Sequence, residues 1–201
     1  MMKHLTIFLL ISLTFNLSAQ ESKKFKKLKY NTNYRLGSVT LVNGEQVDGL
    51  VKATNKLTDR VVFVAKSGTI TTYVPGQIRS FEISGNTYVS GIDNFYKQLR
   101  SGQHLGLYIR EEDKVLKYQP HVEDYYYELK TNETNVEYFI NHHLSTDFKP
   151  IADFEGNFDK LLNYLSDCPE LREKLQNTKA DLENESFLIT LIRIYNNCRR
   201  E

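Results

Sequence analysis

The chain has 201 residues, of which 26 are Lys or Arg and 25 are Asp or Glu, so its formal net charge is +1. Hydrophobic residues make up 40% of the chain, which supports an ordinary core and excludes a disordered protein. The charge balance provides no global field to attract nucleic acid, and the length fits one domain or two small ones.

Residues 1–19 form a predicted signal peptide. Lys3 precedes an apolar run over residues 7–17, and the small residues Ser18 and Ala19 follow it. This order is typical of a secretory signal, and the apolar run is too short to span a bilayer stably. We expect cleavage after Ala19; an uncleaved anchor is the alternative. Removing Lys3 leaves 25 basic against 25 acidic residues, a net charge of zero.

The next segment, residues 20–34, is rich in lysine. Its first part, QESKKFKKLKY, holds five lysines and one acid. We expect a solvated, mobile terminal tail, because chain ends are poorly ordered unless they are tied down. The alternative is a weak contact to an acidic polymer or a membrane surface.

A β-rich module is predicted over residues 35–130. In its first part, residues 36–90, five to six short β-prone runs alternate with turn residues and show no helical periodicity. This spacing favours an antiparallel small β-barrel or a curved sheet.

The first hairpin of this module is predicted at Asn43-Gly44, because Asn-Gly between β-prone runs is a strong turn signal. Alternation makes Val47 a candidate cross-strand partner of Val39. Gly49 lies inside the second strand, where a bulge or a close backbone approach would explain it.

A second β meander is predicted over residues 94–130, without a linker before it. It is rich in tyrosine, a residue that is enriched at recognition surfaces. We take Tyr108, Tyr118, Tyr125 and Tyr127 as candidate binding residues. The alternative is that half of these rings fill the seam between the two β blocks.

The C-terminal region, residues 131–201, is predicted to be a helical pair or small bundle. The segment VEYFINHHL is ambiguous between a helix and a strand. Asn157 can cap a helix that follows it, a second helix starts near Pro169, and residues 185–198 form the most apolar helix.

The chain contains two cysteines, Cys168 and Cys198. Because disulfides persist in oxidising compartments, we expect an exported chain to join them. Two buried free thiols are the alternative.

Sequence motifs for catalysis are missing. The chain has no G-x-S-x-G elbow, no P-loop and no H-E-x-x-H. Adjacent histidines such as His142-His143 point apart on a helix or strand, so we expect no metal site and no cofactor. A hydrolase would have to use scattered residues, with His104, His121, Glu123 and Asp124 as its candidates.

Two resemblances follow from these motifs. The segments GSVTLVNGEQVDGLV, YVPGQIRSFEI and LLNYLSDCPELREKL, with a Tyr-Asn-x-Cys ending, resemble a group of exported Bacteroidetes proteins with no assigned activity. That resemblance covers nearly the whole mature chain and implies a bacterial envelope or secreted location.

The first strands also resemble Sm-like barrels, which share the pattern V-x-L-x-x-G-x-x-V-x-G. The later Arg-Gly dipeptide and Asn-bearing loop of that family are missing here. The resemblance therefore implies barrel-like folding and no RNA-binding residues.

Taken together, the sequence predicts an exported α+β protein with a non-catalytic binding or structural role in the bacterial envelope. It would be periplasmic, associated with the outer envelope, or secreted. Its partner is expected to be an envelope protein or polymer and not nucleic acid. A hydrolase of envelope polymers and a surface adhesin that uses the lysine-rich segment are the alternatives.

Overall fold

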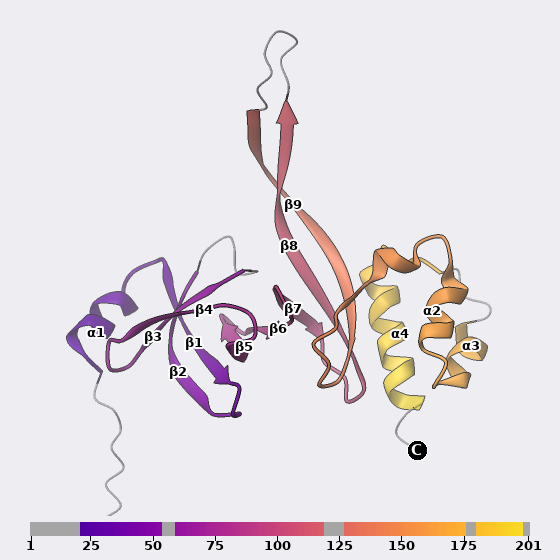
Figure 1. Ribbon diagram of the computed structural model, residues 1–201, viewed down its shortest axis with the longest axis horizontal. Coiled ribbons are helices and arrows are strands. Elements are labelled where there is room, and N and C mark those ends of the chain that lie inside the picture. Colours follow the sequence, from indigo (N-terminus) through magenta and orange to yellow (C-terminus); the bar gives the residue numbers. More distant parts are fainter. Residues whose placement is uncertain (1–20, 54–58, 119–126, 176–179, 199–201) are drawn as a thin grey trace, which may run out of the picture.

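The computed structural model describes residues 21–53, 59–118, 127–175 and 180–198. These residues form one antiparallel sheet of ten strands with helices at both ends of it (Figure 1). The predicted α+β class is therefore confirmed. The signal peptide predicted over residues 1–19 lies outside the described residues.

The elements follow one another along the chain with short connections. They are α1 (Lys23–Lys29), β1 (Tyr34–Leu41), β2 (Gln46–Lys52), β3 (Val61–Ala65), β4 (Ile70–Tyr73), β5 (Ile78–Ile83), β6 (Asn86–Ser90), β7 (Phe95–Arg100), β8 (Leu105–Tyr118), β9 (Tyr127–His142), β10 (Lys149–Pro150), the 3-10 helix η1 (Ile151–Phe154), α2 (Phe158–Tyr164), α3 (Pro169–Leu175) and α4 (Glu185–Cys198).

The sheet has the strand order β10-β9-β8-β7-β6-β5-β1-β2-β3-β4, and its pairings leave it open with β4 and β10 at the two edges. Its N-terminal half is curved. Phe63 of β3, Phe81 of β5 and Phe95 of β7 belong to one buried cluster, although these strands are not neighbours. Of the two predicted arrangements, a small barrel or a curved sheet, the pairings describe a curved, open sheet.

The hairpin between β1 and β2 has the predicted register, with Val39 opposite Val47. Of the residues in its turn, Gly44 has a positive φ, of 89°, whereas Asn43 does not. The amide of Gly44 donates to the carbonyl of Leu41, as in a type I turn followed by a left-handed glycine. The turn is therefore one residue longer than the two-residue Asn-Gly turn that the sequence suggests.

Gly49 of β2 permits a close approach between strands. A Cβ atom there would lie 2.4 Å from the Phe63 ring and 2.4 Å from the Val64 carbonyl oxygen. The expected close backbone approach is therefore the reason for this glycine.

The lysine-rich segment is not the mobile tail that the sequence suggested. It forms α1, which Ser22 caps by accepting a hydrogen bond from the amide of Phe25. Phe25 is 1% exposed and packs against Leu50 and Val64 on the convex side of the sheet. This apolar anchor ties the segment down.

The β-rich part of the chain ends later than residue 130, the predicted boundary. Strand β9 continues to His142, and the ambiguous segment VEYFINHHL supplies its last seven residues. Ile140 pairs with Leu107 in the register with β8, and both are fully buried. Pairing with β8 therefore decides the conformation, and a short apolar run does not reveal that long-range contact.

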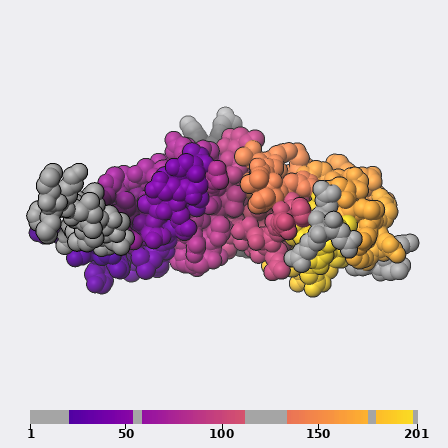
Figure 2. Space-filling model, turned by 90° about the horizontal axis from the view of Figure 1, so that it is seen from below, coloured from indigo at the N-terminus to yellow at the C-terminus, as the bar shows by residue number. Residues whose placement is uncertain are grey.

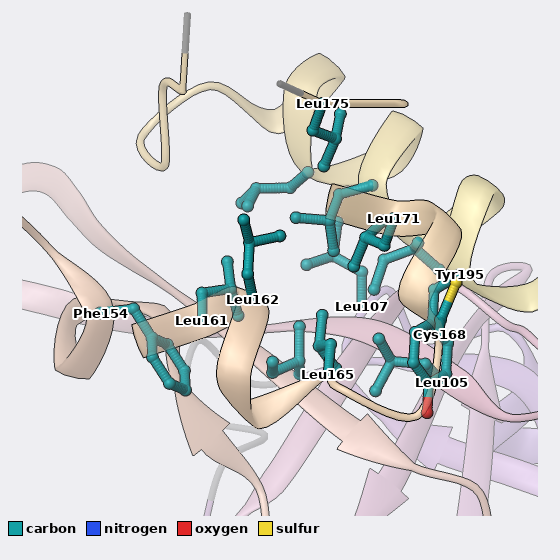
Figure 3. Packing of buried hydrophobic residues seen from close by; sticks show 14 of the residues in the cluster. Leu105, Leu107, Phe154, Leu161, Leu162, Leu165, Cys168, Leu171, Leu175 and Tyr195 are labelled. Carbon is teal, nitrogen blue, oxygen red and sulfur yellow. The ribbon is translucent and has the colours of Figure 1, made fainter. Parts of the chain in front are cut away.

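The helices α2, α3 and α4 form a layer that buries the C-terminal half of the sheet, where α4 packs against β8. Figure 3 shows leucines of α2 and α3 in the same cluster as Leu105 and Leu107 of β8, and Leu188 and Leu191 of α4 belong to that cluster too. Asn157 caps α2 as predicted, since its side chain accepts from the amide of Lys160 at 3.0 Å.

Cys168 and Cys198 form the predicted disulfide, with their Cα atoms 5.9 Å apart. Cys168 lies immediately before α3, and Cys198 is the last residue of α4. The bond therefore joins the end of the final helix to the α2–α3 connection.

The molecule is elongated. Figure 2 shows the N-terminal strands and the C-terminal helices at opposite ends of its long axis. None of the helices in the described part of the chain has the length and apolar character needed to cross a membrane.

Candidate functional site

A cavity of about 530 Å³ lies where the bases of β8 and β9 meet α4. Its volume is within the range of small-ligand pockets. The residues that line it are polar or aromatic: Gln103, His104, His142, His143, Asp167 and Tyr195.

Asn196 of α4, which is 9% exposed, fixes one wall of this cavity. Its amide oxygen accepts from the backbone amides of His104 at 2.8 Å and Leu105 at 3.2 Å. Its amide nitrogen donates to the carbonyls of Leu105 and Ile192, each at 2.8 Å. The start of β8 is thus held against α4 by one side chain.

A hydrogen-bonded pair also lines the cavity. The phenol of Tyr195 donates to a carboxylate oxygen of Asp167 at 2.6 Å. The ring of His142 lies 5.4 Å from the ring of Tyr164 and 5.9 Å from that of Tyr195. These aromatic contacts hold the imidazole of His142 in place.

The two adjacent histidines reach the same cavity because the strand ends between them. His142 is the last residue of β9, and the amide of His143 donates to the carbonyl of His104 at 2.8 Å. The sequence argument that adjacent histidines point apart applies within a strand and not at its end.

Tyr164 borders this region, and its phenol has a pKa above the usual value. Burial is the largest cause, and the nearby carboxylates of Asp147 and Asp167 add to it. The ammonium of Lys149 acts in the opposite direction. The phenol is therefore a neutral hydrogen-bonding group at physiological pH.

Imidazole, carboxylate and phenol groups can bind a polar ligand or transfer protons. Metal binding is less well supported, because no group of three or more His, Cys, Asp or Glu residues in the described ranges has the geometry to hold an ion.

A second candidate region is the β8–β9 ribbon, which we define as residues 110–118 and 127–138. It projects from the body of the molecule (Figure 1). At the root of the two strands β7 pairs with Leu107 and Ile109, and β10 pairs with Phe139 and Ile140. Beyond this root, the described parts of β8 and β9 pair with each other alone.

Two ion pairs mark the base of the ribbon. Arg110 contacts Glu137 across the two strands at 2.7 Å, and Lys97 of β7 contacts Glu111 at 3.2 Å. The guanidinium of Arg110 also lies 5.5 Å from the centre of the Phe139 ring. These contacts link the two strands to each other, and β8 to β7, at the base of the ribbon.

The predicted tyrosines fall into three different places. Tyr108 is 9% exposed and packs edge-on against Phe148 at 4.8 Å, so its ring belongs to the interior. This places one of the four rings in the interior, as the alternative expects, and burial does not support Tyr108 as a binding residue. Tyr118 and Tyr127 are register partners in the ribbon, and Tyr125 lies outside the described residues.

Of the four hydrolase candidates, His104 lines the cavity. His121, Glu123 and Asp124 lie outside the described residues. Sequence reasoning missed Asp167 and Tyr195 as site residues, because the contact between them spans 28 residues of chain. Both residues lie close in sequence to a cysteine of the predicted disulfide, and this was the one signal that could have placed them near each other.

Comparison with known proteins adds no assignment: no family model, no curated protein and no solved structure matches this chain significantly.

Proposed function

We propose that this protein is an exported, non-catalytic binding protein of the bacterial envelope, and that the β8–β9 ribbon is the part that contacts its partner. The observation that carries the proposal is the pairing pattern: from Arg110 outward, the described part of each strand pairs with the other strand alone.

The length of the ribbon supports a role in recognition. Nine residues, 110–118, extend β8 beyond its root, and at about 3.3 Å per residue this corresponds to roughly 30 Å. A two-stranded ribbon in water is marginally stable at best, so a partner that adds a strand or covers a face would stabilise it. The partner chemistry that fits is an extended polypeptide segment, which pairs with a free edge through its main chain.

Charge along β8 would make such pairing selective. Residues 110–114 read Arg-Glu-Glu-Asp-Lys. Charged side chains at an exposed edge suppress pairing with unrelated strands, which is how natural sheets avoid aggregation. A partner strand would therefore carry complementary charge.

Site-specific crosslinking tests this proposal. Val136 is 47% exposed and is the register partner of Glu111 at the base of the ribbon. A photoreactive amino acid in place of Val136 should yield one defined adduct in envelope extracts of the native cells. The same amino acid in place of Val74, which is 43% exposed and lies outside the ribbon, should not.

A shortened ribbon provides the specific control. Replacing residues 112–135 by Asn-Gly joins the paired residues Glu111 and Val136 through a two-residue turn. Excess unlabelled full-length protein should abolish the adduct, and the shortened protein should not. Equal competition by both proteins would contradict a role for the ribbon, as would adducts at Val74 and Val136 alike.

A hydrolase remains the second candidate, and the cavity is the observation that favours it. It brings His104 together with His142, His143 and Asp167. A histidine and a carboxylate are common acid–base groups in hydrolysis.

Turnover of a polysaccharide and peptide panel tests the hydrolase. His104→Ala should abolish activity without unfolding, because Asn196 holds the backbone of His104 and not its side chain. No turnover of any substrate, or activity that survives His104→Ala and His142→Ala, would exclude catalysis at this cavity.

A further inference from the structure

The strongest unexplained surface feature is the outward face of α1. Phe25 and Leu28 point into the sheet, one helical turn apart. At 100° per residue the opposite face holds Lys23, Lys26 and Lys27, all exposed. Among the lysines of α1, Lys29 forms an ion pair with Glu21 at 3.4 Å.

Charge is distributed unevenly along the molecule. Residues 21–35 contain six basic side chains and one acidic one, a net charge of +5. Residues 151–198 contain five basic and nine acidic side chains, a net charge of −4. Figures 1 and 2 show these two parts at opposite ends of the long axis. The molecule is thus positive at the α1 end and negative at the helical end.

Tyr30 adds an exposed aromatic ring to the positive end. It follows α1 directly and is 88% exposed, and Leu36 nearby in sequence is 63% exposed. Tyrosine is enriched at the membrane–water interface because its ring is apolar and its tip is polar. A lysine face beside such a ring is the composition of a surface that binds anionic lipid headgroups.

We infer that the α1 face docks on an anionic phospholipid membrane and orients the molecule, with the acidic helical end directed away from the bilayer. The inference is independent of the proposed function, because it requires neither the ribbon nor the cavity. Binding is electrostatic and peripheral, since the apolar side of α1 is already buried against the sheet.

Vesicle cosedimentation tests the inference on the mature protein. We expect binding to vesicles of phosphatidylglycerol and phosphatidylethanolamine, no binding to phosphatidylcholine vesicles, and release at high salt. Lys23→Gln/Lys26→Gln/Lys27→Gln should weaken binding roughly a hundredfold at low ionic strength, about fivefold for each lysine. Substitution is preferable to deletion of the segment, which would remove the buried Phe25.

Two matched variants separate lysine position from total charge. The triple Lys→Arg variant at the same positions should bind as the unmodified protein does. Arg100→Gln/Lys174→Gln/Arg193→Gln removes three charges from exposed residues outside α1 and should leave binding unchanged. Equal loss in both glutamine variants would overturn the inference.

A tryptophan probe tests the orientation. The chain contains no tryptophan, so the fluorescence of a single introduced tryptophan comes from that position alone. Tyr30→Trp should show a blue shift in emission on adding the anionic vesicles, whereas Leu144→Trp should not, although Leu144 is 87% exposed. A shift at both positions would contradict the orientation. Binding to soluble dextran sulfate without binding to vesicles would overturn the membrane inference. The partner of the α1 face would then be an acidic polymer.

Discussion

Asn196 concentrates four hydrogen bonds in one side chain at the wall of the cavity. Asn196→Leu keeps the approximate volume but leaves the backbone amides of His104 and Leu105 without their acceptor. Burying unpaired backbone groups costs about 1–3 kcal/mol each, so we expect a loss of about 3 kcal/mol in the free energy of unfolding. Urea denaturation measures it.

The adjacent Asn197 provides the control for this loss, because it lies on the same helix but is exposed. Asn197→Leu should change the free energy of unfolding by less than about 0.5 kcal/mol. Equal effects of the two variants would mean that the contact of Asn196 with β8 does not stabilise the fold.

Buried tyrosines make stability depend on pH in the alkaline range. Burial raises the pKa of Tyr108 above its ordinary value of 10.0, and a hydrogen bond with Gln98 partly opposes this. Burial likewise raises the pKa of Tyr96, opposed by Arg110. A raised folded pKa means that the native state binds the phenolic proton more tightly than the unfolded chain does.

The stabilisation from these phenols is fully present below the unfolded pKa and is lost as pH rises through the folded pKa. We therefore expect the free energy of unfolding to fall above about pH 10. Tyr108→Phe should reduce the slope of that fall, as measured by urea denaturation at a series of alkaline pH values. Identical slopes in both proteins would exclude a contribution from Tyr108.

Among the elements, α4 depends most clearly on a covalent bond. The disulfide closes a loop with a sequence separation of 30 residues, and the chain-entropy model assigns such a loop about 3–4 kcal/mol. Cys168→Ala/Cys198→Ala should lower the free energy of unfolding by about this amount. Reducing agent should destabilise the unmodified protein similarly and leave the variant unchanged; an effect on the variant would point to another cause.

Elements with local signals could be predicted from the sequence. Asn157 capped α2 as expected, and Val39 met Val47 across the first hairpin. The helix α1 could not be predicted, because its stability depends on Phe25 reaching Leu50 and Val64. Likewise the cavity joins His104, Asp167 and Tyr195 from three segments, and no local pattern encodes that convergence.

At the scale of the whole molecule, one sheet connects two separate cores. The curved N-terminal half encloses one cluster of buried residues, and the helical layer covers another around β8 and β9. Between them lies a small aromatic seam of Tyr96, Tyr108, Phe139 and Phe148. The strand pairings of β6, β7 and β8 are continuous through this seam, so backbone and side chains both couple the two halves.

Phe148 tests that coupling, because its ring stacks on Tyr96 at 4.0 Å and meets Tyr108 edge-on at 4.8 Å. Phe148→Ala should cost about 3–4 kcal/mol, the usual loss for a buried phenylalanine. Because it removes the side-chain link and keeps the strands, we also expect the two halves to unfold at different urea concentrations. Hydrogen exchange should then show earlier loss of protection in one half.

Phe158 supplies the comparison, since it is a partly buried aromatic residue at the margin of the helical core. Phe158→Ala should cost less and leave a single transition, because it does not lie between the two cores. If Phe148→Ala also unfolds in one transition, the continuous sheet alone is sufficient to make the halves cooperative. The seam would then contribute stability without carrying the coupling between the N-terminal and helical ends.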